Sequence, residues 1–210
     1  MSAPDIEATD AEMMRRCLAL SQSSGAHGEY PYAAVIARKG KLVCETINRA
    51  ARDHDVTRHA EVVALTEAQK VLNRTSLDDC TIYANAEPCA YCCYAIREAR
   101  IGRVVYGLQS PVMGGHSRWD ILADTGLSTA IPEVFAEPPE IVAGYMENEA
   151  EEVFKTWHPL IWQFIKSRRL FVRHSDGPAH ATINRETHRN DTWHRIKNAF
   201  RRIVIDRIGR

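Results

Sequence analysis

The stretch "NAEPCAYCCYAI" (residues 85–96) holds the features that decide the fold of this chain. Pro88 stands directly before the first of three cysteines, and proline favours the first turn of a helix, so a helix is predicted from there to about residue 100. Residues three positions apart share a helix face, whereas adjacent residues point about 100° apart. Cys89 and Cys92 can therefore face one metal ion, while Cys93 is turned away from it.

Two cysteines leave a zinc site incomplete, because a catalytic zinc ion normally has three protein ligands and an open position for water. Thiolates are the form of cysteine that binds zinc, and a helix N-terminus stabilises them. His59 in "RHAEVVAL" is the candidate third ligand, since it stands at the predicted start of another helix. Glu61 follows two residues later, and it is free to move protons because it is not needed as a ligand.

Other kinds of site contain a pair of cysteines at this spacing. A lone C-x-x-C can be redox-active, or it can form half of a structural zinc site. A redox motif would need a thioredoxin-like setting at the start of the domain, and a structural site would need a fourth Cys or His at short spacing; neither is evident here. H-x-E followed by P-C-x-x-C is the pattern of zinc deaminases. The joint pattern therefore favours a catalytic zinc centre.

Strand and helix patterns alternate around these two motifs. Strands separated by helices of this length imply crossover connections, and hence an α/β layered fold. The expected elements are a helix opened by the capping box Thr9–Glu12, a hairpin over 32–48, a helix over 59–73 capped by Asp55 or Thr57, strands at 80–86, 102–108 and 139–145, a short helix from about Ser117, and a helix over 148–170 that Pro159 breaks.

The two motifs resemble those of a known superfamily. "HAE" at 59–61 and "EPCAYC" at 87–92 are similar to the cytidine deaminase superfamily, and "TRHAEVVAL" with "IYANAEPCAYC" is most similar to the branch that holds bacterial guanine deaminases and tRNA adenosine deaminases. The resemblance covers about residues 10–172 and weakens after about residue 108. It implies a three-layer α/β/α sandwich with a five-stranded mixed sheet, one zinc ion per subunit and usually a homodimer.

The resemblance also implies roles for individual residues. His59, Cys89 and Cys92 would bind zinc, Glu61 would be the catalytic proton carrier, and Asn48 would hydrogen-bond the substrate. Zinc lowers the pKa of bound water to about 7, so Glu61 can take a proton from that water at neutral pH. Water would replace an exocyclic amine on the base, and ammonia would be released.

Substrate choice in this family depends on two segments that close the pocket. Here they are "GLQSPVMGGHSRWDIL" (residues 107–122) and the segment with Trp157, His158 and Trp162. Trp119 is a candidate for stacking on a base and His116 for hydrogen bonding to it. Ordinary packing for Trp119, and a surface loop position for His116, explain them equally well.

Charge helps to choose between substrate classes. The chain of 210 residues has a formal net charge of zero, but residues 185–210 hold eight Arg and Lys against three acids, so this tail is +5 and the rest is −5. An acidic main domain argues against a large nucleic-acid partner, because phosphate binding needs basic surface. A free nucleobase or nucleoside, of the guanine type or cytosine, is the first expectation and tRNA the second. A non-catalytic zinc-containing binding module is the alternative of another class, and the presence of Glu61 argues against it.

The chain divides into one main domain and an appendage. We expect a zinc-dependent deaminase domain over residues 1–174, a polar linker over 175–190 and a basic amphipathic helix over 191–210. The N-terminus has no charged-then-apolar leader, and no run approaches the ~18 apolar residues of a membrane span. A cytoplasmic protein with no membrane partner is the expectation.

Overall fold

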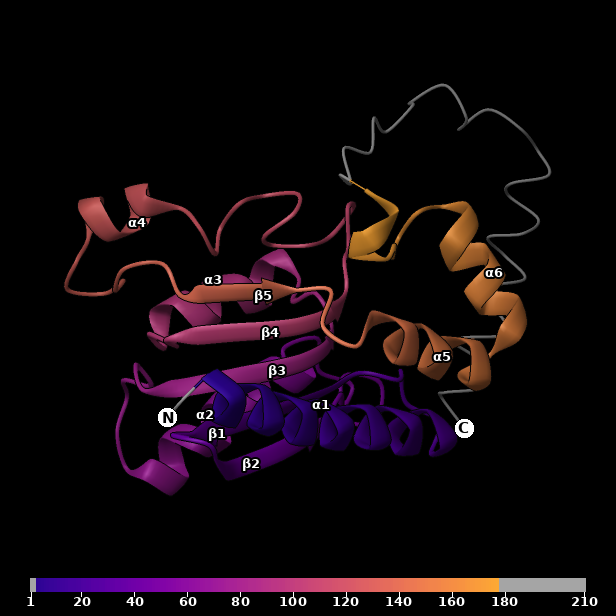
Figure 1. The fold of residues 1–210 in the computed structure, drawn as a ribbon, viewed down its shortest axis with the longest axis horizontal. Coiled ribbons are helices and arrows are strands. Elements are labelled where there is room, and N and C mark those ends of the chain that lie inside the picture. The colour runs from indigo at the N-terminus through magenta and orange to yellow at the C-terminus, as the bar shows by residue number, and fades with distance from the viewer. Residues whose placement is uncertain (1–2, 178–210) are drawn as a thin grey trace.

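The core of the molecule is a five-stranded mixed sheet, seen in a computed structural model that describes residues 3–177 (Figure 1). The strands lie in the order β2-β1-β3-β4-β5, with β1 antiparallel to both of its neighbours and β3, β4 and β5 parallel. This confirms the predicted sheet, the hairpin and the edge strand. The strands are β1 (Ala33–Arg38), β2 (Lys41–Ile47), β3 (Cys80–Ala86), β4 (Arg103–Leu108) and β5 (Glu140–Ala143).

Helices cover both faces of the sheet, which makes the three layers expected for this fold. Successive side chains of a strand point to opposite faces. In β1, Val35 packs in the core with α1 and α5, while Ala34 and Ile36 pack in the core with α2 and α3. The helices are α1 (Ala3–Ala26), α2 (Ala60–Leu72), α3 (Ala90–Glu98), α4 (Thr125–Ala130), α5 (Glu147–Trp157) and α6 (Pro159–Ser167), followed by the short 3-10 helix η1 (His174–Asp176).

The first helix begins earlier than the sequence pattern predicted. It starts at Ala3, so Thr9 lies inside the helix and the predicted capping box Thr9–Glu12 is wrong. The residues before Thr9 contain no helix breaker beyond Pro4, and proline is tolerated in a first turn. A capping pattern in the sequence therefore did not stop a helix that could extend further.

The start of α2 also differs from the prediction. Its N-cap is His59, with extended backbone and no side-chain cap hydrogen bond. Asp55 instead accepts hydrogen bonds from the backbone N–H and the hydroxyl of Thr57, at 2.8 and 2.6 Å. The prediction that Asp55 or Thr57 caps this helix is wrong, and the cap position belongs to the candidate metal ligand.

The long connection between β4 and β5 is held by one buried arginine. Residues 116–119 and 121–123 form turns, and the helix of this connection is α4, so the short helix predicted from about Ser117 is misplaced. Arg97 of α3 is 2% exposed. Its guanidinium donates five hydrogen bonds, to the carbonyl oxygens of Ile121, Leu122, Asp124 and Ala136 and to the hydroxyl of Ser128.

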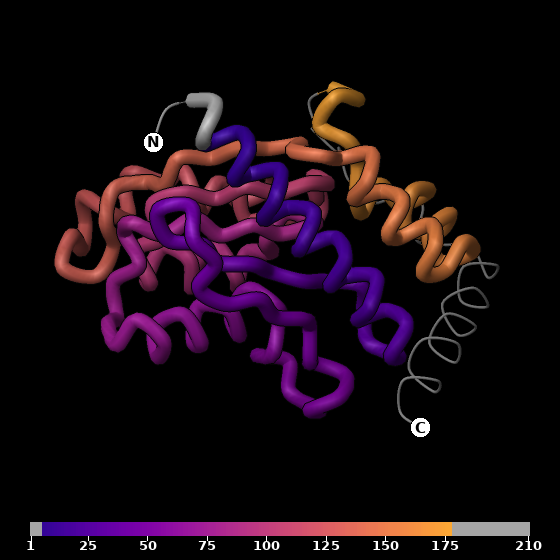
Figure 2. Tube along the Cα trace, turned by 60° about the horizontal axis from the view of Figure 1, so that its bottom comes forward, coloured from indigo at the N-terminus to yellow at the C-terminus, as the bar shows by residue number. Residues whose placement is uncertain are grey.

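The C-terminal part of the described chain returns to the sheet. The predicted break at Pro159 is confirmed, since α5 ends at Trp157 and His158 caps α6. Figures 1 and 2 both place α5 beside α1, and a side chain at Gly25 would collide with the ring of Trp157. Beyond α6, Val172 pairs with Gln109 through two backbone hydrogen bonds of 2.9 Å. This pairing brings the chain back to the end of β4.

Part of the predicted domain organisation lies beyond these residues. The expected linker over 175–190 is described only as far as residue 177, and the expected basic helix over 191–210 lies outside the described residues. Within residues 3–177, no helix has both the length and the apolar character needed to cross a membrane.

The hydrogen bonds of Arg97 generate a first prediction. Arg97→Met should lower the free energy of unfolding by about 3 kcal/mol, because hydrogen bonds to a charged group contribute about 1.5–3 kcal/mol each and part of this loss is recovered by water. Chemical denaturation monitored by circular dichroism measures the change.

Arg100→Met is the matched control, because Arg100 also donates to loop carbonyl groups, of Pro132 and Val134, but from the surface. Its cost should stay below about 1 kcal/mol. Equal losses for the two variants would show that the burial of Arg97 is not what stabilises this loop.

Candidate active site

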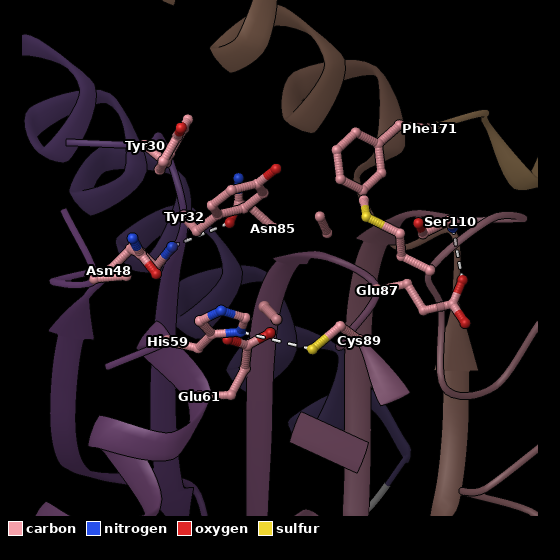
Figure 3. A pocket seen from close by; sticks show the side chains of 15 residues that line it. Tyr30, Tyr32, Asn48, His59, Glu61, Asn85, Glu87, Cys89, Ser110 and Phe171 are labelled. Atoms are coloured by element: carbon pink, nitrogen blue, oxygen red, sulfur yellow. Dashed lines mark hydrogen bonds between the residues drawn. The ribbon is translucent and has the colours of Figure 1, made fainter. Parts of the chain in front are cut away.

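A pocket lies where the N-termini of α2 and α3 meet the ends of the central strands (Figure 3). Its volume is about 280 Å³. In Figure 3, His59, Glu61 and Cys89 lie at its base, Tyr30 and Asn48 on one side and Glu87 with Ser110 on the other. The pocket therefore joins segments from residue 30 to residue 171 of the chain.

His59, Cys89 and Cys92 are brought together at the base of this pocket. His59 is the N-cap of α2, Cys89 is the N-cap of α3, and Cys92 lies in the first turn of α3. The Nδ1 atom of His59 lies 3.3 Å from Sγ of Cys92 and 3.6 Å from Sγ of Cys89, and the two sulfur atoms are 3.5 Å apart. The three side chains are positioned to hold one metal ion.

The spacing of these atoms matches the requirements of zinc. In a tetrahedral site with Zn–S near 2.3 Å and Zn–N near 2.0–2.1 Å, the ligand atoms lie about 3.5–3.8 Å apart. The observed separations of 3.3, 3.5 and 3.6 Å are close to this range. A set of three protein ligands is typical of catalytic rather than structural zinc sites, which have four.

The electrostatics of the cluster favour a thiolate. A hydrogen bond from Cys92 and another from His59 lower the pKa of Cys89 to about 4. The pKa of His59 is raised, first by its hydrogen bond to Cys89. Cys89 also stands at a helix N-terminus, where the helix dipole favours negative charge. The site therefore prepares an anionic sulfur ligand.

Cys93 stands outside the cluster, as predicted from the helix geometry. It is fully buried, and its thiol donates to the carbonyl oxygen of Pro88 at 3.2 Å. A side chain at Gly115 would collide with Cys93, so the loop after β4 packs directly against this face of α3. Cys93 packs as a small core residue.

Glu61 lines the pocket from the first turn of α2. Loss of solvent around its carboxyl group, together with the negative charge of Cys89, raises its pKa to about 7. A carboxyl group with a pKa near neutrality can both accept and return a proton. Figure 3 shows this group beside the His59 ring, at the bottom of the cavity.

Asn48 forms part of one wall of the pocket, directly after β2. Its side-chain amide donates a hydrogen bond of 2.8 Å to Glu29. Glu29 also accepts from the backbone N–H groups of Tyr30, Ala51 and Arg52. The buried carboxylate thus ties Asn48 to the loop that follows it.

Asn85 closes the pocket between β1 and β3. Its side-chain oxygen accepts from the N–H of Ala33 at 3.1 Å, and its amide donates to the carbonyl oxygen of Pro31 at 2.8 Å. Both the oxygen and the NH₂ group of the Asn85 side chain are therefore used in holding the start of β1.

Glu87 organises the opposite wall. Its carboxylate accepts from the backbone N–H groups of Ser110, His116 and Ser117 and from the hydroxyl of Ser117, at 2.6–3.0 Å. A side chain at Gly114 would collide with this carboxylate. The loop after β4 is thereby folded over the first turn of α3.

The structure does not bring His116 and Trp119 into the pocket. The ring of His116 hydrogen-bonds the hydroxyl of Tyr106 at 2.9 Å. Trp119 is 57% exposed, with the guanidinium of Arg118 over its ring. The same loop contributes Met113 to the lining instead. Substrate contacts by His116 and Trp119 stay predictions.

An aromatic cluster forms the roof of the pocket. Phe171 and Tyr32 both line the cavity, and their ring centroids are 6.2 Å apart. Phe154 contacts both rings, and Trp162 stacks on Phe154 from behind. The C-terminal segment closes the pocket as expected, but through Phe171 rather than through Trp157, His158 or Trp162.

The sequence reasoning missed several residues of the pocket. Glu87 stands inside the "EPC" motif, which could have marked it, whereas Tyr30 precedes β1 in a loop without a recognisable pattern. Phe171 lies 82 positions after Cys89 and carries no local signal, so only the folded chain reveals it.

Comparisons with known proteins agree with this geometry. The sequence model of the "cytidine and deoxycytidylate deaminase zinc-binding region" matches residues 7–108. The tRNA-specific adenosine deaminase of Agrobacterium fabrum is 29% identical over 157 residues, which are 75% of this chain and 94% of that protein. The guanine deaminase of Bacillus subtilis is 42% identical over 79 residues, which are 38% of this chain and 51% of that protein.

A solved structure, from a study of A-to-I editing by tRNA:A34 deaminases at the wobble position of transfer RNA, superposes with a TM-score of 0.61 at 30% identity. The match covers 68% of this chain and 99% of the other. The zinc-binding motifs, the fold and this relative agree, and the chain therefore belongs to the family of zinc-dependent deaminases that share the cytidine and deoxycytidylate deaminase zinc-binding region.

Proposed function

We propose that this protein is a hydrolytic deaminase of a free nucleobase or nucleoside, with guanine-type bases as the first candidates and cytosine as the next. In this proposal His59, Cys89 and Cys92 hold the zinc ion, and Glu61 is the catalytic residue. The reaction consumes one water molecule and one amino-substituted base, and it yields ammonia and the oxo base.

The side chains around the pocket divide this work. When bound, zinc supplies a water molecule whose pKa is lowered to about 7. Glu61 would carry both protons of the water molecule that is consumed, the first to the ring nitrogen of the base and the second to the departing amine, which leaves as ammonia. Its pKa near 7 suits both directions of transfer. Asn48, Tyr30 and Phe171 hold the base against this proton carrier.

The small volume and the aromatic lining of the pocket are the observations that carry the substrate proposal. The cavity of about 280 Å³ lies just below the ~300–1,000 Å³ that small-molecule pockets usually occupy. Tyr32 and Phe171 offer apolar ring surface to a planar ligand. These features suit one base or a small nucleoside.

A tRNA adenosine remains the second candidate. The observation in its favour is that the chain spans 94% of the tRNA-specific adenosine deaminase of Agrobacterium fabrum. A base flipped out of a single strand would enter the same pocket. The net charge of −5 before residue 185 is the argument that places this candidate second.

A homodimer is also part of the proposal. A groove of about 540 Å³ runs between the outer faces of α2 and α3, lined in part by Val62, Leu65 and Ala95. Tyr91 and Tyr94 stand exposed on α3. We infer that this groove and the exposed aromatic rings beside it are the contact between subunits.

The metal ligands can be tested by their zinc content. Cys92→Ser should lose most of its zinc, because a serine hydroxyl does not replace a thiolate ligand. Cys93→Ser is the matched control on the adjacent residue and should retain about one zinc ion per chain. Inductively coupled plasma mass spectrometry measures both, and the reverse result would disprove the assignment of the helix faces.

A substrate panel tests the proposed reaction. Ammonia release should be measured with guanine, cytosine, adenine, their nucleosides and a tRNA anticodon stem. We expect a free base or nucleoside to be turned over at least about 10-fold faster than the anticodon stem, because the small pocket favours a small ligand. Turnover of the anticodon stem alone would support the second candidate, and a zinc-loaded protein without any turnover would be a binding module.

Glu61→Gln provides the control for catalysis. This variant should keep its zinc but lose about 10²–10⁴-fold in kcat, the usual contribution of a positioned general acid-base group. A fully active variant would remove Glu61 from the mechanism.

The oligomeric state is checked by sedimentation velocity. Two chains of 23.7 kDa should sediment together as one species, and Ala95→Arg should shift them toward the monomer, because it places a charge in the groove between α2 and α3. A wild-type protein that sediments as a monomer at micromolar concentration would contradict the dimer.

A further inference from the structure

Glu29 is a buried carboxylate next to the pocket that the proposed mechanism does not use. It lies in the connection between α1 and β1 and is 5% exposed. A buried charge is costly unless it is paired or fully hydrogen-bonded. The surroundings of this carboxylate therefore need an explanation.

Four N–H groups surround Glu29. One carboxylate oxygen accepts from the side-chain amide of Asn48 at 2.8 Å and from the N–H of Tyr30 at 2.9 Å. The other oxygen accepts from the N–H groups of Ala51 and Arg52 at 3.1 and 3.0 Å. None of the ion pairs found among residues 3–177 includes Glu29. Both oxygens therefore act as acceptors of neutral donors.

This arrangement fixes the orientation of the Asn48 amide. An ionised carboxylate can only accept hydrogen bonds, and each amide has one donor end and one acceptor end. The end of Asn48 that meets Glu29 must therefore be its NH₂ group. The main chain of Asn48 is held as well, since its N–H donates to the carbonyl oxygen of Tyr32 at 2.9 Å.

The opposite end of the amide is left for the ligand. Asn48 lines the pocket, and among residues 3–177 no hydrogen bond is found to its side-chain oxygen. Asn85, the other amide of the pocket, uses both of its ends, one on Ala33 of β1 and the other on Pro31. Asn48 is thus the amide that can accept a hydrogen bond from a base.

We propose that Glu29 is a positioning residue that holds the side-chain oxygen of Asn48 toward the pocket, so that the site selects bases presenting an N–H donor to this wall. The inference rests on the proposed function and adds a specificity determinant to it. A ring nitrogen with a lone pair, placed at the same point, would meet an acceptor and be disfavoured.

A purely structural role is the competing explanation, because Glu29 also holds the loop at Ala51 and Arg52. The two explanations differ in a double-mutant cycle. If Glu29 acts through Asn48, its replacement has no further effect once the Asn48 amide is gone. If Glu29 only holds the loop, the KM of the double variant rises by the product of the two single increases.

The cycle consists of wild type, Glu29→Gln, Asn48→Ala and the double variant, each loaded with zinc. Glu29→Gln is nearly isosteric, but the NH₂ group of the glutamine is a donor, so the Asn48 amide can flip and present its oxygen to residue 29 instead. With guanine, we expect KM to rise about 10-fold in each single variant, the usual effect of one lost hydrogen bond, with kcat within about threefold of wild type. The double variant should equal Asn48→Ala.

Asp10→Asn is the matched control. Asp10 is a buried carboxylate that accepts hydrogen bonds from Tyr83 and Arg103. It lies in a separate groove and does not line the pocket of the active site. Its melting temperature should fall while KM stays unchanged. Binding of 8-azaguanine measured by calorimetry gives a second readout that needs no turnover.

Each outcome bears on a distinct statement. Multiplying effects in the double variant, or a wild-type KM in Glu29→Gln, would overturn the positioning role. If wild type deaminates another base, the proposed guanine preference fails, and the same cycle with that base tests Glu29. If no base is deaminated, the calorimetric cycle decides, and absent binding of the analogue would count against this inference as well.

Discussion

The convergence of two helix N-termini at one edge of the sheet is the constraint on which the site depends. The N-cap of a helix is usually a serine, threonine, aspartate or asparagine that satisfies a free backbone N–H. Here the two cap positions hold His59 and Cys89, and neither side chain makes a cap hydrogen bond. The exposed donors and helix dipoles then favour negative charge between the two helices, where thiolates and the carboxylate of Glu61 gather.

Two buried carboxylates stabilise the walls on either side of this centre. Glu29 holds the Asn48 side and Glu87 holds the loop after β4, and each accepts four hydrogen bonds. Backbone N–H groups provide most of these donors, and such groups keep a fixed direction once the loops are folded. Both walls are therefore rigid for the same physical reason, although they come from unrelated segments of the chain.

The local parts of this architecture could be predicted from the sequence. Each strand was located from its apolar pattern, and the pairing of Cys89 with Cys92 followed from the three-residue spacing on a helix. The beginning of α1 was predicted wrongly because the Thr9–Glu12 pattern also fits the interior of a longer helix. The cap of α2 was predicted wrongly because statistics favour Asp55 or Thr57, whereas the site requires His59 at that position.

The substrate side of the pocket resisted prediction because it is made by contacts between distant residues. Phe171 reaches Tyr32 only because Val172 pairs with Gln109 beside the end of β4. No periodicity within a window of 10 to 20 residues reports such a contact. The prediction of His116 and Trp119 rests on their chemistry alone; in the structure the ring of His116 hydrogen-bonds Tyr106, and Trp119 is exposed. The metal centre is thus encoded by short motifs, whereas the shape that selects a base is encoded by the packing of the whole domain.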